Sequence, residues 1–384
     1  MADADHCRGL FGGPITRPAN ELPKTSGAFQ PASTFDEYLR DRRRRRRARG
    51  SMRRQPLVVI VVILALHMPG ATRPARAEPT TDQILADIGL SADERRQVMN
   101  GEFVTTRLAR VSERDLPVAL IVFVVTTSPD TLARQIMTGD FITTDPQVQM
   151  YGRFGAPGSL ADLAGLKISG DVAHQLYNAR AGRAVNLATS EIAAFNALQS
   201  DAAPTVRAQL QRMLLARYQA YRASGLGGIA PYDRGSGRTT DLVSDLRKAS
   251  QSARLFEKYM PAFHAVIIGY PQATVAGMQQ DFRWVSYNFE GKSTYVLLHM
   301  LSAADGAARA IVQRHYYVST GYNGQQTVAG FLPVQGGTLV VCAAHVFTDQ
   351  VAGFGGALKR GIGRRILADK MRQIFDAGRT KLAK

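Results

Sequence analysis

The sequence predicts an α+β fold in which an antiparallel sheet packs against a long C-terminal helix and a helical insertion interrupts the order of elements. Strand-like segments separated by short glycine-containing turns fill residues 282–347, and strands so closely spaced pair antiparallel. Helical spacing of apolar residues dominates residues 155–265, which we expect to form the insertion. An amphipathic helical pattern follows, with one apolar face formed by Val351, Phe354, Leu358, Ile362, Leu367, Met371, Ile374 and Phe375.

An export signal is predicted at residues 52–77. Two arginines precede an apolar segment of twelve residues, 57–68, and a small-x-small cleavage pattern that ends at Ala77 follows. The apolar segment is shorter than the roughly 20 residues that a membrane-spanning helix needs. We therefore expect cleavage after Ala77 and a periplasmic or secreted protein of residues 78–384. The alternative is a membrane anchor formed by residues 57–68.

Residues 1–51 are expected to form a disordered extension. They are rich in Pro, Gly and Arg, show no apolar periodicity and contain an uninterrupted arginine run at 42–47, a composition that cannot form a packed core. Two explanations for a signal behind such a segment stay open. Either the gene model is too long and translation starts at Met52, or residues 1–51 stay in the cytoplasm in front of an anchor.

Charge and cysteine content exclude two classes of protein. The formal charge is +17, but 15 of the 48 Lys and Arg and 6 of the 31 Asp and Glu lie in residues 1–77, which leaves +8 for residues 78–384. Half of the basicity thus belongs to the N-terminal segment, and no nucleic-acid partner is expected. Cys342 is the single cysteine after the signal, so an internal disulfide is excluded and a buried, unreactive thiol is expected.

Residues 82–154 form the first predicted block. One or two short helices and a half-buried strand are predicted over 82–111. The apolar, β-branched segment 115–127 predicts a well-buried strand. Ser128 is a favourable N-cap and Pro129 a favourable first helical residue, so a helix is expected to begin there, followed by a further strand.

The longest helical pattern of the insertion covers residues 204–223. Its apolar face is formed by Val206, Leu210, Met213, Leu214, Tyr218 and Tyr221. Four arginines recur at intervals of five residues, namely Arg207, Arg212, Arg217 and Arg222. At about 100° per residue each is displaced by roughly 140° from the last, so they form no basic stripe and a solvated helix surface is expected. The glycine-rich segment 224–238 is predicted to be a loop and hinge.

The chain resembles the START-like superfamily, also called SRPBCC or helix-grip, in the order of these elements. The segment LPVALIVFVVTTSPDTLARQIMTGDFITTDPQVQMYGRFG is similar to the opening of that domain, in which a strand enters a short helix through a small-Pro-acidic turn and a strand follows. Residues 282–378 resemble its later half, where a curved antiparallel sheet wraps a long C-terminal helix. The resemblance implies one START-like domain over 78–384, interrupted by the helical insertion at about 155–265, with a cavity between sheet and helix that takes apolar ligands.

Catalytic and metal-binding motifs are missing from the sequence. It contains no G-x-S-x-G, P-loop or H-E-x-x-H pattern and no Cys/His metal spacing, so no catalytic residue, metal or cofactor is assigned. His299, His315 and His345 fall on predicted strands and are expected to be hydrogen-bonded histidines in or near the core. The alternative is a coupled catalytic group, because His345 shortly precedes Asp349. Lone carboxylates such as Asp281 and Asp349 are expected to be helix caps or ion-pair partners.

Function is predicted from the shape that the resemblance implies. The candidates for a cavity lining are Trp284, Tyr287, His315, Tyr317 and Phe354, with plain core packing as the alternative for each. The leading hypothesis is an exported protein that binds or carries a lipid or other hydrophobic small molecule. A peripheral membrane contact is left open. Two alternatives stay open. One is a hydrolase or cyclase on the same fold with His315 as acid or base, and the other is a structural envelope protein with a filled core.

Overall fold

The structure is a computed structural model and describes residues 80–138, 142, 145–289 and 291–352. The predicted N-terminal extension and signal lie outside the described residues. So do residues 353–384, which include Phe354 and most of the predicted C-terminal helix.

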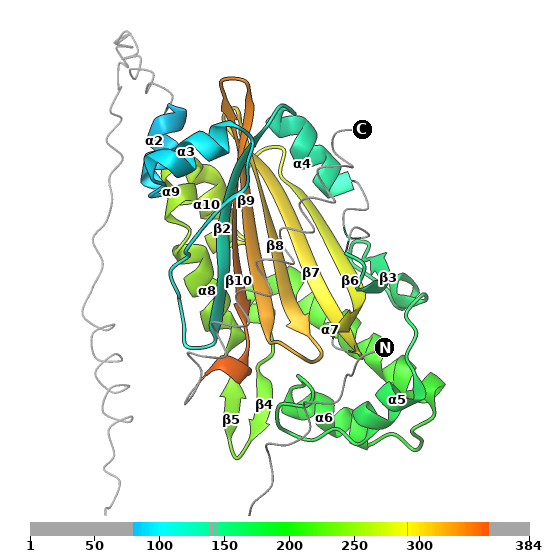
Figure 1. Cartoon of the computed structure of the whole chain (residues 1–384). Helices are drawn as coiled ribbons and strands as arrows, with labels where there is room; N and C mark the ends of the chain where they lie inside the picture. Colours follow the sequence, from blue (N-terminus) through cyan, green and yellow to red (C-terminus); the bar gives the residue numbers. More distant parts are fainter. Residues whose placement is uncertain (1–79, 139–141, 143–144, 290, 353–384) are drawn as a thin grey trace, which may run out of the picture. The chain divides into compact units, whose positions relative to one another are not determined.

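Eight strands of the described chain form one antiparallel sheet, in the order β1-β2-β10-β9-β8-β7-β6-β3 (Figure 1). Strands β6 to β10 form a meander, and β2 pairs with β10, so the first long strand lies beside the last. The predicted large antiparallel sheet is confirmed. The strand bounds are β1 Val104–Thr106, β2 Asp115–Val125, β3 Val148–Arg153, β6 Gln279–Phe289, β7 Lys292–Asp305, β8 Ala308–Val318, β9 Gly324–Val334 and β10 Gly337–Phe347.

Helices lie mainly between β3 and β6, in the segment that was predicted to be the insertion. A small hairpin of β4 (Tyr232–Gly235) and β5 (Arg238–Thr240) lies among them. The remaining helices are α2 and α3 before the sheet, α4 between β2 and β3, and the 3₁₀ turn η4 (Asp349–Val351) after β10. The helix bounds are α2 Thr81–Asp87, α3 Ala92–Met99, α4 Pro129–Thr138, η2 Leu160–Leu163, α5 Gly170–Tyr177, α6 Thr189–Asn196, α7 Ala203–Ser224, η3 Gly225–Gly228, α8 Leu242–Gln251, α9 Arg254–Tyr259 and α10 Pro261–Gly269.

The sheet has two differently covered faces. Helices α7, α8 and α10 lie on one side, which we call the helix face, and α4 lies on the other, which we call the α4 face (Figure 1). Each face buries its own apolar cluster, because successive side chains of a strand point to opposite sides. Neighbouring residues of β7 illustrate this: Leu297 belongs to the cluster on the helix face and Leu298 to the cluster on the α4 face, and both are fully buried.

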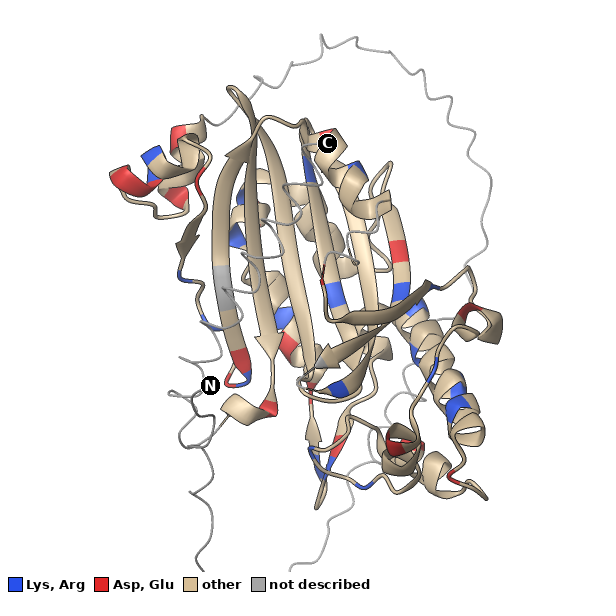
Figure 2. Cartoon of the chain, turned by 45° about the vertical axis from the view of Figure 1, so that its right-hand side comes forward, with Lys and Arg blue, Asp and Glu red and all other residues tan. Residues whose placement is uncertain are grey.

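Local signals fixed the start of α4 and the orientation of α7. The Ser128 Oγ atom accepts a hydrogen bond from the Thr131 backbone N–H at 3.3 Å, and Pro129 is the first residue of α4, as predicted. All six residues of the predicted apolar face of α7 are buried, from Val206 to Tyr221. Figure 2 shows charged residues spaced along the helices, whereas most of each long strand carries none.

Two expectations about the insertion were wrong. Arg217 is not solvated, because its side chain is buried and paired with Glu191. The segment 224–238 is not an irregular loop, because it forms the turn η3 and most of the β4–β5 hairpin. The hairpin is held from outside: the Tyr232 hydroxyl donates to the Asn323 carbonyl at 2.9 Å, and Arg234 Nε donates to Asp349 at 2.8 Å.

Two further boundaries differ from the prediction. The strand expected over residues 101–111 is reduced to the three residues of β1. At the other end, Val351 belongs to η4, and Ala352 after it is extended, with φ −79° and ψ 144°. The predicted helix therefore does not begin at Val351.

Candidate functional site

The three strand histidines are all buried, as expected, but they lie on different faces of the sheet. His299 stacks on Phe282 at a centroid distance of 4.2 Å on the helix face. His345 stacks on Phe347, which also belongs to the helix face. His315 pairs across the strands with Leu298 and lies on the α4 face.

Four polar residues lie in one line across the helix face. His299 of β7 is directly opposite Arg314 of β8, Arg314 is opposite Gln326 of β9, and Gln326 is opposite His345 of β10. Directly opposite residues of an antiparallel pair project to the same side, so these four side chains are neighbours. All four are buried. We call this set the polar row.

Arg314 is the centre of the polar row and is only 2% exposed. Its Nε donates to Gln326 Oε1 at 2.7 Å, and its Nη2 donates to Ser250 Oγ at 3.0 Å and to the Ile267 carbonyl. No ion pair joins it to a carboxylate of the described residues. Ser250 and Ile267 lie in the last turns of α8 and α10, where helix dipoles favour a positive charge. Two helix ends thus compensate the guanidinium in place of an acid.

His299 forms the end of the polar row under α7. Its Nδ1 lies 3.2 Å from the Tyr221 hydroxyl, and the Tyr221 ring stacks on Tyr316 at 4.0 Å. The His299 Nε2 atom and the Tyr316 hydroxyl are buried and have no hydrogen-bond partner among the described residues. Burial, with a smaller contribution from the charge of Arg314, lowers the pKa of His299 well below its usual value. The imidazole is therefore neutral at physiological pH.

His345 forms the other end of the polar row. Its Nδ1 lies 2.9 Å from the Oδ2 atom of Asp115, which is fully buried. The same Oδ2 accepts the Val111 backbone N–H at 2.9 Å, so Asp115 ties the loop before β2 to the sheet. Asp349 pairs with Arg234, which confirms the expectation that it is an ion-pair partner. The alternative, a coupling of His345 with Asp349, is not found, because His345 pairs with Asp115.

The α4 face has its own polar group, centred on His315. The His315 Nδ1 atom lies 2.8 Å from the Tyr322 hydroxyl, and the His315 Nε2 atom lies 2.9 Å from the Gln313 Nε2 atom. The Tyr287 ring lies 6.4 Å from the imidazole. Burial raises the pKa values of Tyr287 and Tyr322, so both phenols are neutral hydrogen-bonding groups. Apolar side chains of six strands and α4 surround this group.

The predicted lining residues do not share one site. Tyr287 and His315 lie together on the α4 face. Trp284 lies on the helix face, where its Nε1 donates to the Asp162 carbonyl at 2.8 Å, and Tyr317 lies there under the Arg217 guanidinium at 4.4 Å. Phe354 is outside the described residues.

A β-bulge explains the separation of His315 from Tyr317. Tyr317 is opposite Leu297 and His315 is opposite Leu298, so Tyr316 is an extra residue in β8. Regular alternation places residues 315 and 317 on one face, and the extra residue reverses that relation. The sequence contains no glycine or other marker at this position, so the alternation pattern alone could not reveal the change.

Cys342 and Asp281 have the environments that the sequence predicted. Cys342 is 1% exposed, and burial raises the pKa of its thiol to about 12, which leaves little reactive thiolate at neutral pH. Asp281 pairs with Arg283 through an Oδ2–Nε distance of 2.6 Å, and Arg283 is itself buried. Asp281 is thus an ion-pair partner and Cys342 is a buried apolar group.

The sequence contains one signal for the polar row, in the spacing of residues around the β7–β8 turn. In a two-residue hairpin, positions at equal distance from the turn are directly opposite each other. The β7–β8 turn joins Asp305 to Ala308, and counting outward from it brings His299 opposite Arg314. Nothing comparable identifies Ser250, whose contact with the row depends on the packing of α8.

The acid sensitivity of folding is the first testable consequence. Because the pKa of folded His299 lies below its unfolded value of about 6.5, the unfolded chain binds a proton at low pH that the folded chain excludes. Stability is therefore complete above that value and is lost as pH falls through it. We expect this group to remove about 1.4 kcal/mol between about pH 7.5 and 5.5.

Chemical denaturation of wild type and His299→Gln at the two pH values measures the effect. The variant should lose less stability on acidification than wild type by about that amount. His174→Gln is the control, because His174 is exposed on α5. Equal acid sensitivity of wild type and His299→Gln would show that His299 titrates normally in the folded protein.

The described residues provide no metal centre and no membrane span. No group of three or more His, Cys, Asp and Glu side chains in this part of the chain is placed to hold a metal ion. None of the helices in the same part has the length and apolar composition needed to cross a membrane. Comparison of the chain with protein-family models, with curated proteins and with solved structures gave no match.

Proposed function

We propose that this chain is an exported protein that binds or carries a lipid or other hydrophobic small molecule against the α4 face of its sheet. The observation that carries the proposal is the environment of His315. Apolar side chains of β2, β6–β10 and α4 surround a small hydrogen-bonded group formed by His315, Tyr322 and Gln313. An apolar surface with a few convergent polar groups is typical of small-molecule sites.

The order of elements supports the START-like resemblance on which this function rests. A strand, β2, leads through the Ser128-Pro129 turn into α4 and then to β3, and an antiparallel meander fills the later half. The helical insertion lies between β3 and β6 and covers the helix face. In the START-like family the ligand lies between the sheet and the C-terminal helix. Because the insertion occupies the helix face, the α4 face is the side of the sheet that remains for a ligand.

The helix face is a less suitable place for an apolar ligand, because aromatic rings already fill it. Phe154 stacks on Tyr218 at 4.3 Å, and Tyr221 stacks on Tyr316 at 4.0 Å. Both α7 tyrosines are fully buried. We therefore propose Tyr287 and His315 as ligand contacts and regard Trp284 as part of the core.

The adjacent residues Leu297 and Leu298 give a matched test of this function. Both are fully buried leucines of β7, but Leu297 faces the helices and Leu298 faces the proposed site. Leu297→Ala should lower the free energy of unfolding by about 2–5 kcal/mol, because it leaves a void in a solid core. Leu298→Ala should cost clearly less if the ligand binds against that side chain, as proposed, and it should change the affinity for an apolar ligand.

Chemical denaturation gives the two stabilities, and titration with the neutral fluorescent probe N-phenyl-1-naphthylamine gives the binding. Wild type and Leu297→Ala should bind the probe equally, and Leu298→Ala should differ from both. Mass spectrometry of small molecules extracted from the purified protein then identifies a natural ligand. Equal core-type losses for the two variants, without probe binding by either, would remove the carrier function and leave the structural alternative.

The enzyme alternative has one observation in its favour. Asp115 orients His345 through Nδ1, an arrangement that suits a general base. That pair lies on the helix face, however, whereas His315 and its apolar surroundings lie on the α4 face. A ligand held at His315 is therefore separated from the His345 imidazole by the sheet, and binding is the better-supported function.

A further inference from the structure

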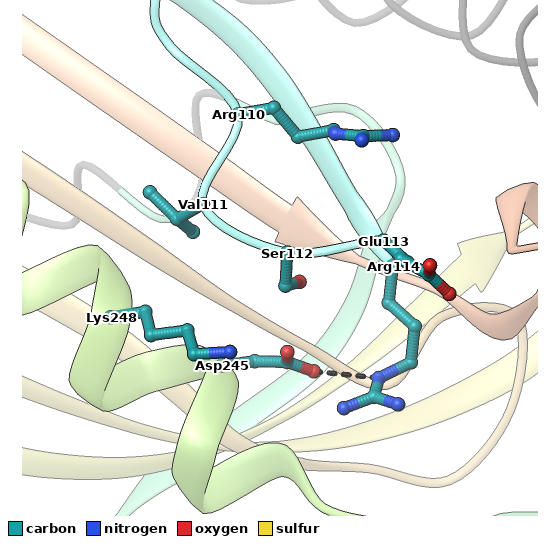
Figure 3. A pocket seen from close by; sticks show the side chains of 7 residues that line it. All are labelled: Arg110, Val111, Ser112, Glu113, Arg114, Asp245 and Lys248. Carbon is teal, nitrogen blue, oxygen red and sulfur yellow. Dashed lines mark hydrogen bonds and ion pairs between the residues drawn. The ribbon is translucent and has the colours of Figure 1, made fainter.

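A polar pocket of about 390 Å³ lies between the loop that precedes β2 and helix α8 (Figure 3). It is on the helix face, so it is distinct from the site proposed above. The loop contributes five side chains and α8 contributes two. The lining residues are Arg110, Val111, Ser112, Glu113, Arg114, Asp245 and Lys248.

The charges of this lining are not balanced. Arg114 Nε donates to the buried Asp245 carboxylate at 2.8 Å, so these two groups neutralise each other. Arg110 and Lys248 are exposed and form no ion pair with any carboxylate that the structure describes. The remaining acid is Glu113, and its carboxylate points away from Lys248 and Ser112 in Figure 3. The unneutralised charge of the pocket is therefore positive.

Hydrogen-bond donors of the pocket also remain available. Arg114 uses Nε for Asp245 and Nη2 for the Asp241 carbonyl at 3.1 Å, which leaves Nη1 free in the described structure. Lys248 points toward the Asp245 side of the pocket in Figure 3, whereas the Ser112 hydroxyl is buried and interacts with the Asp245 carboxylate. A guanidinium N–H and an ammonium group thus remain as hydrogen-bond donors for a ligand.

Hydrogen bonds to buried groups hold the loop before β2 in place. Asp115 accepts the Val111 N–H and lies 2.9 Å from His345 Nδ1, so a buried carboxylate fixes the loop to β10. Arg114 in turn is anchored to α8 by Asp245 and to the Asp241 carbonyl. A ligand therefore meets donors whose positions are already set, which reduces the entropy lost on binding.

We propose that this pocket binds an oxyanion, a phosphate or carboxylate group, either on a free small molecule or on a lipid headgroup. The oxyanion accepts hydrogen bonds from Arg114 Nη1 and Lys248, and the positive charge of Arg110 and Lys248 attracts it. Such charge-assisted hydrogen bonds are the strong ones in proteins. The binding is independent of the hydrophobic site, because the two lie on opposite faces of the sheet.

Inorganic phosphate is the first probe, measured by isothermal titration calorimetry on the mature protein. Sedimentation with phosphatidylcholine vesicles, with and without phosphatidylglycerol, is the second. The test variant is Lys248→Gln combined with Arg110→Gln, two exposed positions whose replacement leaves the Arg114–Asp245 pair intact. The control is Arg247→Gln, which removes a neighbouring exposed charge of α8 outside the pocket.

We expect saturable binding that the double variant weakens by at least about tenfold, the factor for losing one charge-assisted hydrogen bond, while the control changes it less than about twofold. Binding of free phosphate identifies a soluble ligand, and binding of phosphatidylglycerol vesicles alone identifies a headgroup. The proposal is overturned if neither probe binds saturably, or if Arg247→Gln weakens binding as much as the double variant does.

Discussion

Replacing Arg314 by methionine is expected to lower the free energy of unfolding by about 3–5 kcal/mol. The guanidinium donates to Gln326, Ser250 and the Ile267 carbonyl, all of them buried or in the buried ends of α8 and α10. Methionine fills much of the volume but donates no hydrogen bond. The variant thus leaves several buried acceptors with fewer partners, and each such loss costs about 1–3 kcal/mol.

An opposing effect must be weighed against this loss. Burial of a charge is expensive, and apolar replacement of a whole buried ion pair is often neutral or stabilising. Here a single partner is removed and the acceptors stay, because the Ile267 carbonyl belongs to the backbone and cannot be replaced with it. The unpaired acceptors therefore outweigh the relief of burying a charge, and the net change is destabilising.

Urea denaturation of wild type and Arg314→Met measures the difference directly. Arg309→Met is the control, because Arg309 is on the same strand but is partly exposed and pairs with the exposed Asp130. That surface pair should contribute no more than about 1 kcal/mol. If Arg314→Met is as stable as wild type, the polar row does not stabilise the packing of the ends of α8 and α10 on the sheet.

The main architecture could be predicted because local signals determine it. Alternating apolar residues and the short turn at Asp305 specify neighbouring strands and their register, and Ser128 with Pro129 specifies the start of α4. Each signal acts over a few residues and needs no knowledge of the rest of the chain. The sheet, the first helix after β2 and the buried face of α7 were therefore predicted correctly.

Only part of the grouping of the candidate residues could be predicted, because the rest depends on non-local packing. Trp284 and Tyr287 are three residues apart on one strand, so alternation alone places them on opposite faces. The separation of His315 from Tyr317 depends on the bulge, which the sequence does not mark. Ser250 meets Arg314 only because α8 packs across β9, a contact between residues 64 positions apart.

The burial of Arg217 in α7 also depends on packing that its own helix does not specify. Helical geometry correctly predicted that Arg217 shares no stripe with the other arginines of α7. It could not predict that α6 provides Glu191 as a partner. Arg217 Nε and Nη2 donate to the two carboxylate oxygens of Glu191 at 2.7 and 2.6 Å. The exposed fractions of the two side chains are 6% and 15%.

Arg217→Met is expected to lower the free energy of unfolding by about 3–5 kcal/mol, because it leaves the Glu191 carboxylate largely buried without its counter-charge. Adding Glu191→Gln should recover part of that loss, since the amide removes the charge and its oxygen can still accept the Ala188 N–H that Glu191 now accepts at 2.8 Å. Arg212→Met, at an exposed position of α7, should change stability by no more than about 0.5 kcal/mol. Denaturation of wild type, Arg217→Met, Glu191→Gln and the double variant completes a double-mutant cycle, with Arg212→Met as the control. A coupling energy near zero would mean that the Glu191 charge remains solvated and that the two side chains contribute independently.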